Sequence, residues 1–198
     1  MAKTLLELAG ANLTPPALSE TALVVIDAQR EYVDGKLPLP GAAPALSNIA
    51  RLLEKARASG TPVIHVQHKG KAGGLFDPAT TSFALADEAA ATDGETVVEK
   101  GLPNAFAGTN LKDVLDATGR KRLVLAGFMT HMCVSSTARA ALDLGFQTVV
   151  VSDASATRDL PVPGAEGEVL TADDLHRAEL AMLADRFAII CTTDDLAG

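Results

Sequence analysis

The chain has 198 residues, of which 47% are hydrophobic, and its 17 basic and 25 acidic residues give a formal net charge of −8. This composition predicts a single globular domain over residues 1–198. The acidic balance argues against a nucleic-acid-binding face, and the longest apolar runs are too short to span a membrane. Two cysteines and an N-terminus without a signal-peptide pattern favour a cytoplasmic location.

Short apolar runs alternate with helical stripes along the chain. The runs are continuous and rich in β-branched residues, as in parallel strands buried on both faces, and the stripes repeat with helical spacing. This alternation indicates a three-layer α/β/α domain. In chain order the predicted elements are strand 23–26, helix 46–56, strand 63–66, strand 96–98, helix 111–115, strand 123–126, helix 134–144, strand 148–151, helix 175–183 and strand 187–190.

Two segments interrupt this alternation. Residues 69–94 form an insertion between two strands that is rich in glycine and alanine, and we expect a short helix at 83–91 within it. Insertions of this length are often functional, so we expect residues 69–94 to act as a lid over a site in this chain or in a neighbouring subunit. Residues 155–171 contain two prolines and two glycines and are expected to be irregular.

Chemically reactive side chains lie in the segments that follow three of the predicted strands. They are Asp27, Lys100 and Cys133, and the carboxyl ends of parallel strands form one edge of a sheet, where ligands bind. A helix that begins at Cys133 favours its thiolate, which is the nucleophilic form of cysteine. Lys100 can stabilise that thiolate, and Asp27 can accept and return protons. The three residues therefore predict a site for nucleophilic catalysis.

Three blocks of the sequence resemble the isochorismatase-like cysteine hydrolases. The first is Val24–Gln29, the second is Val97–Lys100 together with Asn104–Leu111, and the third is Gly127–Val134. Residues 151–154 and the last predicted helix and strand are also similar to the family. The resemblance extends over residues 21–192, with the blocks in the family's order.

This resemblance implies a fold and a reaction. The fold is a six-stranded parallel sheet with helices on both faces. The reaction uses a triad of Asp27, Lys100 and Cys133, which attacks a carbonyl carbon and forms an acyl-enzyme. The resemblance also implies a cis peptide bond between Phe128 and Met129, which directs the N–H groups of Met129 and Cys133 into an oxyanion hole.

Five further residues are expected to contact the substrate. Gln29 and Phe106 match positions that often line the pocket in this family. Phe128, Thr130 and His131 lie in or beside the turn that precedes Cys133. Members of the family are commonly homo-oligomers, so we expect a dimer or tetramer, and a small-molecule substrate is the other expected partner.

A metal or cofactor is not expected. Nicotinamidases of this family hold a divalent metal through an Asp-x-His pair and a further histidine. Here only His65 and His68 lie in the corresponding segment, and a metal site needs three or four ligands. No glycine-rich phosphate-binding motif follows the first strand either.

Three functions remain open at this point. In the first, Cys133 attacks a small amide or carbamate-type substrate and a C–N bond is cleaved without a cofactor. In the second, the protein hydrolyses a vinyl ether as true isochorismatases do, with Asp27 as the acid and no nucleophilic thiol. In the third, it is a non-catalytic oligomeric binding protein. The presence of Cys133 favours the first.

Overall fold

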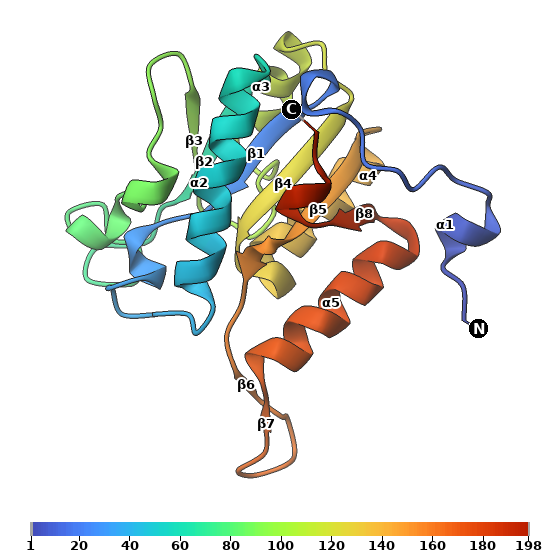
Figure 1. Cartoon of the computed structure of the whole chain (residues 1–198). Helices are drawn as coiled ribbons and strands as arrows, with labels where there is room; N and C mark the ends of the chain where they lie inside the picture. Colours follow the sequence, from blue (N-terminus) through green and yellow to red (C-terminus); the bar gives the residue numbers. More distant parts are fainter. Residues whose placement is uncertain (1, 198) are drawn as a thin grey trace.

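Six parallel strands form the centre of the fold in the computed structural model, which describes residues 2–197 (Figure 1). The strand order is β3-β2-β1-β4-β5-β8. The α/β class and the six-stranded parallel sheet are thereby confirmed. The strands are β1 (Ala22–Ile26), β2 (Val63–His68), β3 (Thr96–Lys100), β4 (Arg122–Phe128), β5 (Gln147–Ala156) and β8 (Ala188–Cys191).

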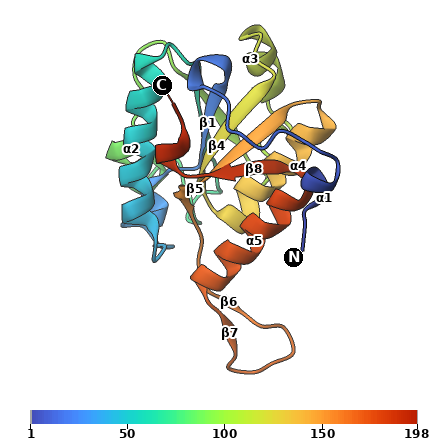
Figure 2. The ribbon, with the colours of Figure 1, turned by 45° about the vertical axis from the view of Figure 1, so that its right-hand side comes forward.

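Helices cover both faces of this sheet. Helix α2 (Ala42–Ala58) packs on one face, and α3 (Leu111–Ala117), α4 (Ser135–Asp143) and α5 (Ala172–Arg186) lie on the other (Figure 2). The short helix α1 (Leu5–Leu8) lies beside α5, where the N–H of Leu5 donates to the Asp185 carboxylate at 2.8 Å. No helix among residues 2–197 combines the length and the apolar character needed to cross a membrane.

Strand β1 shows why the apolar runs are continuous. Its side chains alternate between the two faces, so Leu23 and Val25 pack in the core under α2, while Val24 and Ile26 pack in the core under the other three helices. Burying apolar surface in two cores fixes the three layers, and it places the carboxyl ends of β1, β3 and β4 at one edge.

The inserted segment 69–94 is folded against its own chain. Phe76, Ala86 and Ala89 are buried. The predicted helix at 83–91 is wrong, because two backbone bonds join the insertion to the segment after β1: Arg30 N donates to Ala84 O, and Ala86 N donates to Ala28 O. Only single turns form, at Thr81–Phe83 and Asp87–Ala89. The lid role of this segment stays a prediction.

The expected irregular region 155–171 contains a projecting hairpin. Strand β5 continues to Ala156, five residues beyond its predicted end, and the short antiparallel strands β6 (Leu160–Pro161) and β7 (Val169–Leu170) follow (Figure 1). The pairing of β4 with β5 shifts after Leu125, so that Gly127 lies opposite Ser155. This shift brings the end of β5 alongside the turn that carries Cys133.

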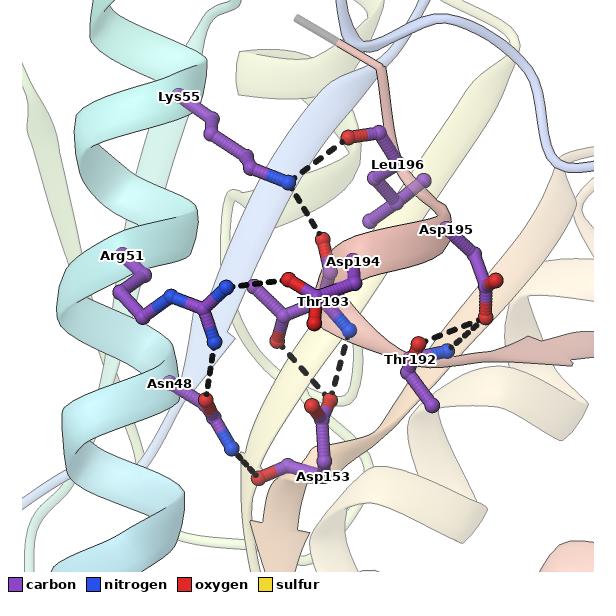
Figure 3. A network of polar contacts seen from close by, with 9 residues as sticks. All are labelled: Asn48, Arg51, Lys55, Asp153, Thr192, Thr193, Asp194, Asp195 and Leu196. Carbon is purple, nitrogen blue, oxygen red and sulfur yellow. Dashed lines mark hydrogen bonds and ion pairs between the residues drawn. The ribbon is translucent and has the colours of Figure 1, made fainter.

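A polar network holds the end of the chain against α2 (Figure 3). The ammonium group of Lys55 donates to the carbonyl oxygens of Thr193 and Leu196, at 2.8 and 3.1 Å. The Asp153 carboxylate in β5 accepts from the N–H and hydroxyl of Thr193, and Arg51 pairs with Asp194. These contacts tie β5 and the final turn Thr193–Asp195 to the helix layer.

Gly127 is required where β4 passes β1. Its φ is +116°, and a Cβ there meets the Ile26 carbonyl oxygen at 1.9 Å. We expect Gly127→Ala to lower the free energy of unfolding by about 3 kcal/mol or more, because the backbone of β1 must move.

The matched control for this substitution is Gly60→Ala. Gly60 also has a positive φ, +67°, but nothing lies within 4 Å of a Cβ there. We expect a loss of about 1 kcal/mol from backbone conformation alone. Urea unfolding measures both variants, and equal losses would show that the contact with Ile26 imposes no cost.

Candidate active site

The structure brings Asp27, Lys100 and Cys133 together at the carboxyl edge of the sheet. The Nζ of Lys100 lies 2.7 Å from Oδ2 of Asp27 and donates to Sγ of Cys133 at 3.3 Å. The three residues are 0%, 3% and 5% exposed. An ion pair and a thiol therefore share a site that is nearly closed to solvent.

The backbone around Asp27 turns sharply as it leaves β1. The φ of Asp27 is +49°, a left-handed conformation that non-glycine residues adopt rarely and that Asp and Asn tolerate best. Asp27 N donates to Val66 O, and Gln29 N donates to Asp27 O, both at 2.8 Å. These bonds hold the carboxylate at the strand end, beside β2.

His68 joins the site from β2, although it was outside the predicted set. The register of β2 with β3 pairs His68 with Lys100, and the Lys100 ammonium lies 3.1 Å from His68 Nδ1. Burial and then the positive charge of Lys100 lower the pKa of His68 to about 4. A neutral imidazole therefore orients the lysine, and the strand register is the signal that identifies it.

Cys133 lies in the wide helical turn Thr130–Val134 that precedes α4. The expectation of a stabilised thiolate is wrong for this arrangement. Burial, followed by the charge of Asp27, raises the pKa of the Cys133 thiol to about 12, and Lys100 only opposes this rise. A raised pKa favours the protonated thiol, which becomes a nucleophile only after a base removes its proton.

Asp27 is placed to be that base. Burial raises the pKa of its carboxyl group, and the Lys100 charge and hydrogen bond act in the opposite direction. A carboxylate with a raised pKa is a stronger base than an exposed one. The structure therefore holds a proton donor and a proton acceptor beside the same ammonium group.

The side-chain amide of Gln29 is already hydrogen-bonded within the protein. Its Nε2 donates to the carbonyl oxygens of His68 and Phe83, at 3.0 and 2.8 Å, and its Oε1 accepts from His68 N at 2.8 Å. The side chain is fully buried. Gln29 thus joins the end of β2 to the inserted segment, and its predicted contact with substrate stays a prediction.

Aromatic rings form one wall of the site. Phe128 is fully buried, with its ring centroid 5.6 Å from that of Tyr32, and Tyr32 also lies edge-on to Phe76 at 5.2 Å. Burial and then the negative charges of Asp27 and Cys133 raise the pKa of the Tyr32 phenol. Tyr32 was outside the predicted set of site residues, although it is the chain's only tyrosine and lies five residues after Asp27.

The turn before Cys133 supplies the opposite wall. The hydroxyl of Thr130 lies 2.8 Å from Nδ1 of His176, and His131 Nδ1 contacts the Thr157 hydroxyl. Each predicted contact residue in this turn therefore already has one partner from the α5 side of the sheet or from the end of β5.

The predicted oxyanion hole lies in the same turn. The peptide bond between Phe128 and Met129 is cis. The N–H groups of Met132 and Val134 both donate to the Met129 carbonyl, at 3.0 and 3.2 Å, so they are already occupied. The N–H groups of Met129 and Cys133 remain the predicted oxyanion donors.

Phe106 packs against the apolar core, and its predicted contact with substrate stays a prediction. Its ring stacks on Phe146 with a centroid distance of 6.0 Å. Phe146 directly precedes β5, at the edge of the sheet opposite to Cys133. Phe106 therefore contributes to the apolar core under α3 and α4, because its loop turns back from the site edge toward those helices.

The two histidines considered as metal ligands lie in different networks. His65 Nε2 is 2.9 Å from the Glu95 carboxylate, whereas His68 contacts Lys100. Among residues 2–197, no group of three or more His, Cys, Asp and Glu side chains is arranged to hold a metal ion.

A cavity of about 640 Å³ lies at the other edge of the sheet. Its walls include Arg122, Phe146 and Phe187, which stand at the starts of β4, β5 and β8, and residues 11–16 of the N-terminal arm. None of Asp27, Lys100 and Cys133 lines this cavity.

Known proteins of one family match almost the whole chain. The family model for the isochorismatase domain matches residues 21–195. An isochorismatase of known crystal structure from Pseudomonas putida KT2440 is 43% identical, with a TM-score of 0.94 over 99% of this chain and 100% of that one. A secreted isochorismatase effector from Verticillium dahliae is 40% identical over 92% of this chain and 94% of its own. A ureidoacrylate amidohydrolase from Agrobacterium fabrum is 29% identical over 91% of this chain and 90% of its own.

Proposed function

This chain belongs to the isochorismatase family of hydrolases, and we propose that within it the protein cleaves the C–N bond of a small amide or carbamate-type substrate, with Cys133 as nucleophile. The amidohydrolase among its relatives supports this reaction class. The observation that carries the proposal is the position of the Lys100 ammonium group between the Asp27 carboxylate and the Cys133 thiol.

The first half of the reaction begins with a proton transfer. Asp27 accepts the thiol proton as Sγ of Cys133 attacks the carbonyl carbon, and Lys100 stabilises the charge on sulfur and carboxylate. The carbonyl oxygen becomes an oxyanion, for which the N–H groups of Met129 and Cys133 are the donors. Asp27 then returns its proton to the leaving nitrogen as the C–N bond breaks, and a thioester on Cys133 results.

The second half regenerates the thiol. Asp27, again a carboxylate, removes a proton from a water molecule that attacks the thioester carbonyl. The C–S bond breaks, the sulfur takes the proton from Asp27, and the acid product leaves. The raised pKa of Asp27 suits this alternation, because the group must bind and release a proton in each half.

The test is hydrolysis of a panel of small amides and carbamoyl compounds by the wild type and by Cys133→Ala. Release of ammonia or amine by the wild type, together with a thioester adduct on Cys133 in acid-quenched samples, is the expected result. Turnover of the panel by Cys133→Ala at the wild-type rate would contradict the proposal.

The pH profile provides a separate prediction. Asp27 acts only as a carboxylate, so kcat/KM falls as pH drops through the pKa of Asp27. Since burial raises that pKa, we expect the acid limb to lie above the ordinary aspartate value of about 3.9. A kcat/KM profile between pH 4 and 9 measures it, and an acid limb at or below the ordinary value would contradict the assignment of Asp27 as base.

A second candidate is hydrolysis of a vinyl ether with Asp27 as the acid. The raised pKa of Asp27 favours it, because the group holds its proton more strongly than an exposed carboxyl does. The two candidate reactions differ in their need for the Cys133 sulfur, which is the nucleophile only in amide hydrolysis. Isochorismate turnover that survives in Cys133→Ala and is lost in Asp27→Asn would favour the ether reaction.

The oligomeric state and the cellular location of the protein are also proposals. We expect a homo-oligomer, a dimer or a tetramer, and a cytoplasmic enzyme. The exposed apolar side chains of Val169 and Leu170 on the hairpin, 56% and 38% exposed, support self-association because water is excluded from such side chains at an interface.

A further inference from the structure

Arg158 lies at the end of β5, on the same edge of the sheet as Cys133. The register shift between β4 and β5 places Ser155 and Ala156 opposite Gly127 and Phe128, so the next two residues of the chain run beside the turn that carries His131. Thr157, the neighbour of Arg158, contacts Nδ1 of His131 through its hydroxyl. Arg158 is thereby held next to the wall of the site.

Two side-chain nitrogens at this place are buried without a partner. Nε of Arg158 and Nε2 of His131 are both shielded from solvent, and neither has a hydrogen-bond partner among residues 2–197. Buried polar groups in folded proteins are normally paired, so unpaired ones require an explanation. In the tautomer in which Nδ1 accepts from the Thr157 hydroxyl, His131 carries its proton on Nε2, and both unpaired nitrogens are then donors.

The charge of Arg158 is also uncompensated. Arg158, like Arg120, Arg177 and Arg186, belongs to no ion pair among residues 2–197, but of these four arginines only Arg158 has a buried side-chain nitrogen without a hydrogen-bond partner. Two acids of the neighbouring segments form hydrogen bonds with other groups. Asp159 accepts from Ala172 N at 2.7 Å, and Glu179 is bound by Ser135 and Arg139.

The electrostatic influence of Arg158 reaches both walls of the site. Burial lowers the pKa of His131, and the Arg158 charge lowers it further, whereas Glu179 opposes the shift. The same charge opposes the rise in the pKa of Tyr32, to which Asp27 and Cys133 contribute. Such effects weaken with distance, so the Arg158 charge acts on the two residues His131 and Tyr32, which belong to opposite walls of the site. Asp27 and Lys100 compensate each other, whereas the Arg158 charge beside His131 has no ion-pair partner among residues 2–197.

We propose that Arg158 and His131 form a carboxylate-binding subsite beside Cys133, so that the preferred substrate is a small amide that also carries a carboxylate. The inference rests on the proposed function, in which Cys133 is the nucleophile. A carboxylate accepts hydrogen bonds from both unpaired donors and compensates the arginine charge. His131 and Arg158 are substrate-binding residues in this proposal, and neither takes part in proton transfer.

The first test compares two alkylating reagents at Cys133. Iodoacetate carries a carboxylate, and iodoacetamide is its neutral counterpart, while both lose iodide to sulfur. The quantity measured is the rate with iodoacetate divided by the rate with iodoacetamide. We expect this ratio at Cys133 to exceed the ratio for glutathione by roughly tenfold, as for one charge-assisted hydrogen bond. Arg158→Gln is expected to reduce the ratio to that of glutathione, and Arg158→Lys to retain part of it.

The matched control is Arg186→Gln. It removes the same charge from an exposed arginine at the end of α5, on the opposite edge of the sheet, and is expected to leave the ratio unchanged. Peptide-resolved mass spectrometry separates Cys133 from Cys191. A wild-type ratio equal to that of glutathione, or a ratio that Arg158→Gln does not change, overturns the subsite while the nucleophile proposal stands.

A second readout does not depend on the thiol. The chain has four histidines, so labelled imidazole groups give four sets of NMR signals, and the set that His131→Gln removes identifies His131. In Cys133→Ala we expect propionate to shift the His131 signals saturably and propionamide to leave them in place. The shift is expected to disappear when Arg158→Gln is added.

The two readouts separate the two proposals. Loss of alkylation by both reagents, together with a propionate shift, would overturn Cys133 as nucleophile and support the subsite. Absence of the propionate shift would overturn the subsite, whatever the reactivity of Cys133.

Discussion

Replacing Cys133 with alanine is expected to lower kcat by about 10⁴-fold or more, because the variant has no group that can form the acyl-enzyme. Every other part of the site remains, including the Asp27–Lys100 ion pair at 2.7 Å. The fold should be preserved, since the side chain loses only its sulfur. Steady-state kinetics on a substrate from the amide panel, with thermal unfolding of the same samples, measures both expectations.

Cys191→Ala is the matched control for this prediction. Cys191 is also buried and free, and burial raises the pKa of its thiol to about 12 as well. It lies in β8, where the charges of Asp195 and Asp153 contribute to the rise in pKa, and it is not part of the cluster of Asp27, Lys100 and Cys133. We expect Cys191→Ala to keep kcat within about twofold, as for a residue outside the reacting groups. Equal losses in the two variants would show that packing, and not nucleophilic attack, explains the effect.

Replacing Lys100 with methionine is expected to lower the free energy of unfolding by about 3–5 kcal/mol at neutral pH. The substitution keeps the length and apolar stem of the side chain but leaves the Asp27 carboxylate buried without a counter-charge. Asp27 is fully buried, so it cannot recover its hydration. Urea unfolding measures the loss. It should shrink as pH falls, because a buried carboxyl with a raised pKa is stable in its protonated form.

The double variant Asp27→Asn/Lys100→Met separates charge from packing. The introduced asparagine is neutral and, like aspartate, tolerates the left-handed backbone at this position, where φ is +49°. We expect the double variant to recover most of the stability lost in Lys100→Met, while hydrolysis stays abolished because the base is absent. A double variant as unstable as Lys100→Met would show that the loss comes from packing rather than from the unpaired carboxylate.

The strand pattern was sufficient to predict the fold and to place the reacting groups. Each of the six apolar runs became a strand of the parallel sheet, because such runs are stable only where both faces of a strand are covered. Asp27, Lys100 and Cys133 all lie at or just beyond strand ends. The carboxyl ends of parallel strands must share an edge, so their meeting needed no side-chain detail.

Strand register and the paths of the loops could not be predicted from the sequence. His68 faces Lys100 because of the pairing of β2 with β3, and Arg158 approaches His131 because of the shift between β4 and β5. Phe106 turned toward the core, and the helix expected at 83–91 was replaced by bonds to residues 28–30. Local patterns do not contain these contacts, because the partners are far apart along the chain.

The pKa of Cys133 illustrates best which properties the sequence determined and which depend on the tertiary structure. By itself the sequence determined the parallel sheet, the edge that carries the site and the three residues that meet there, since all of these follow from which segments must be buried. Only the tertiary structure shows that burial raises the pKa values of the Cys133 thiol and the Asp27 carboxyl and that Arg158 belongs to no ion pair among residues 2–197. Burial and the distances between charges determine these properties, and both exist only after the chain has folded.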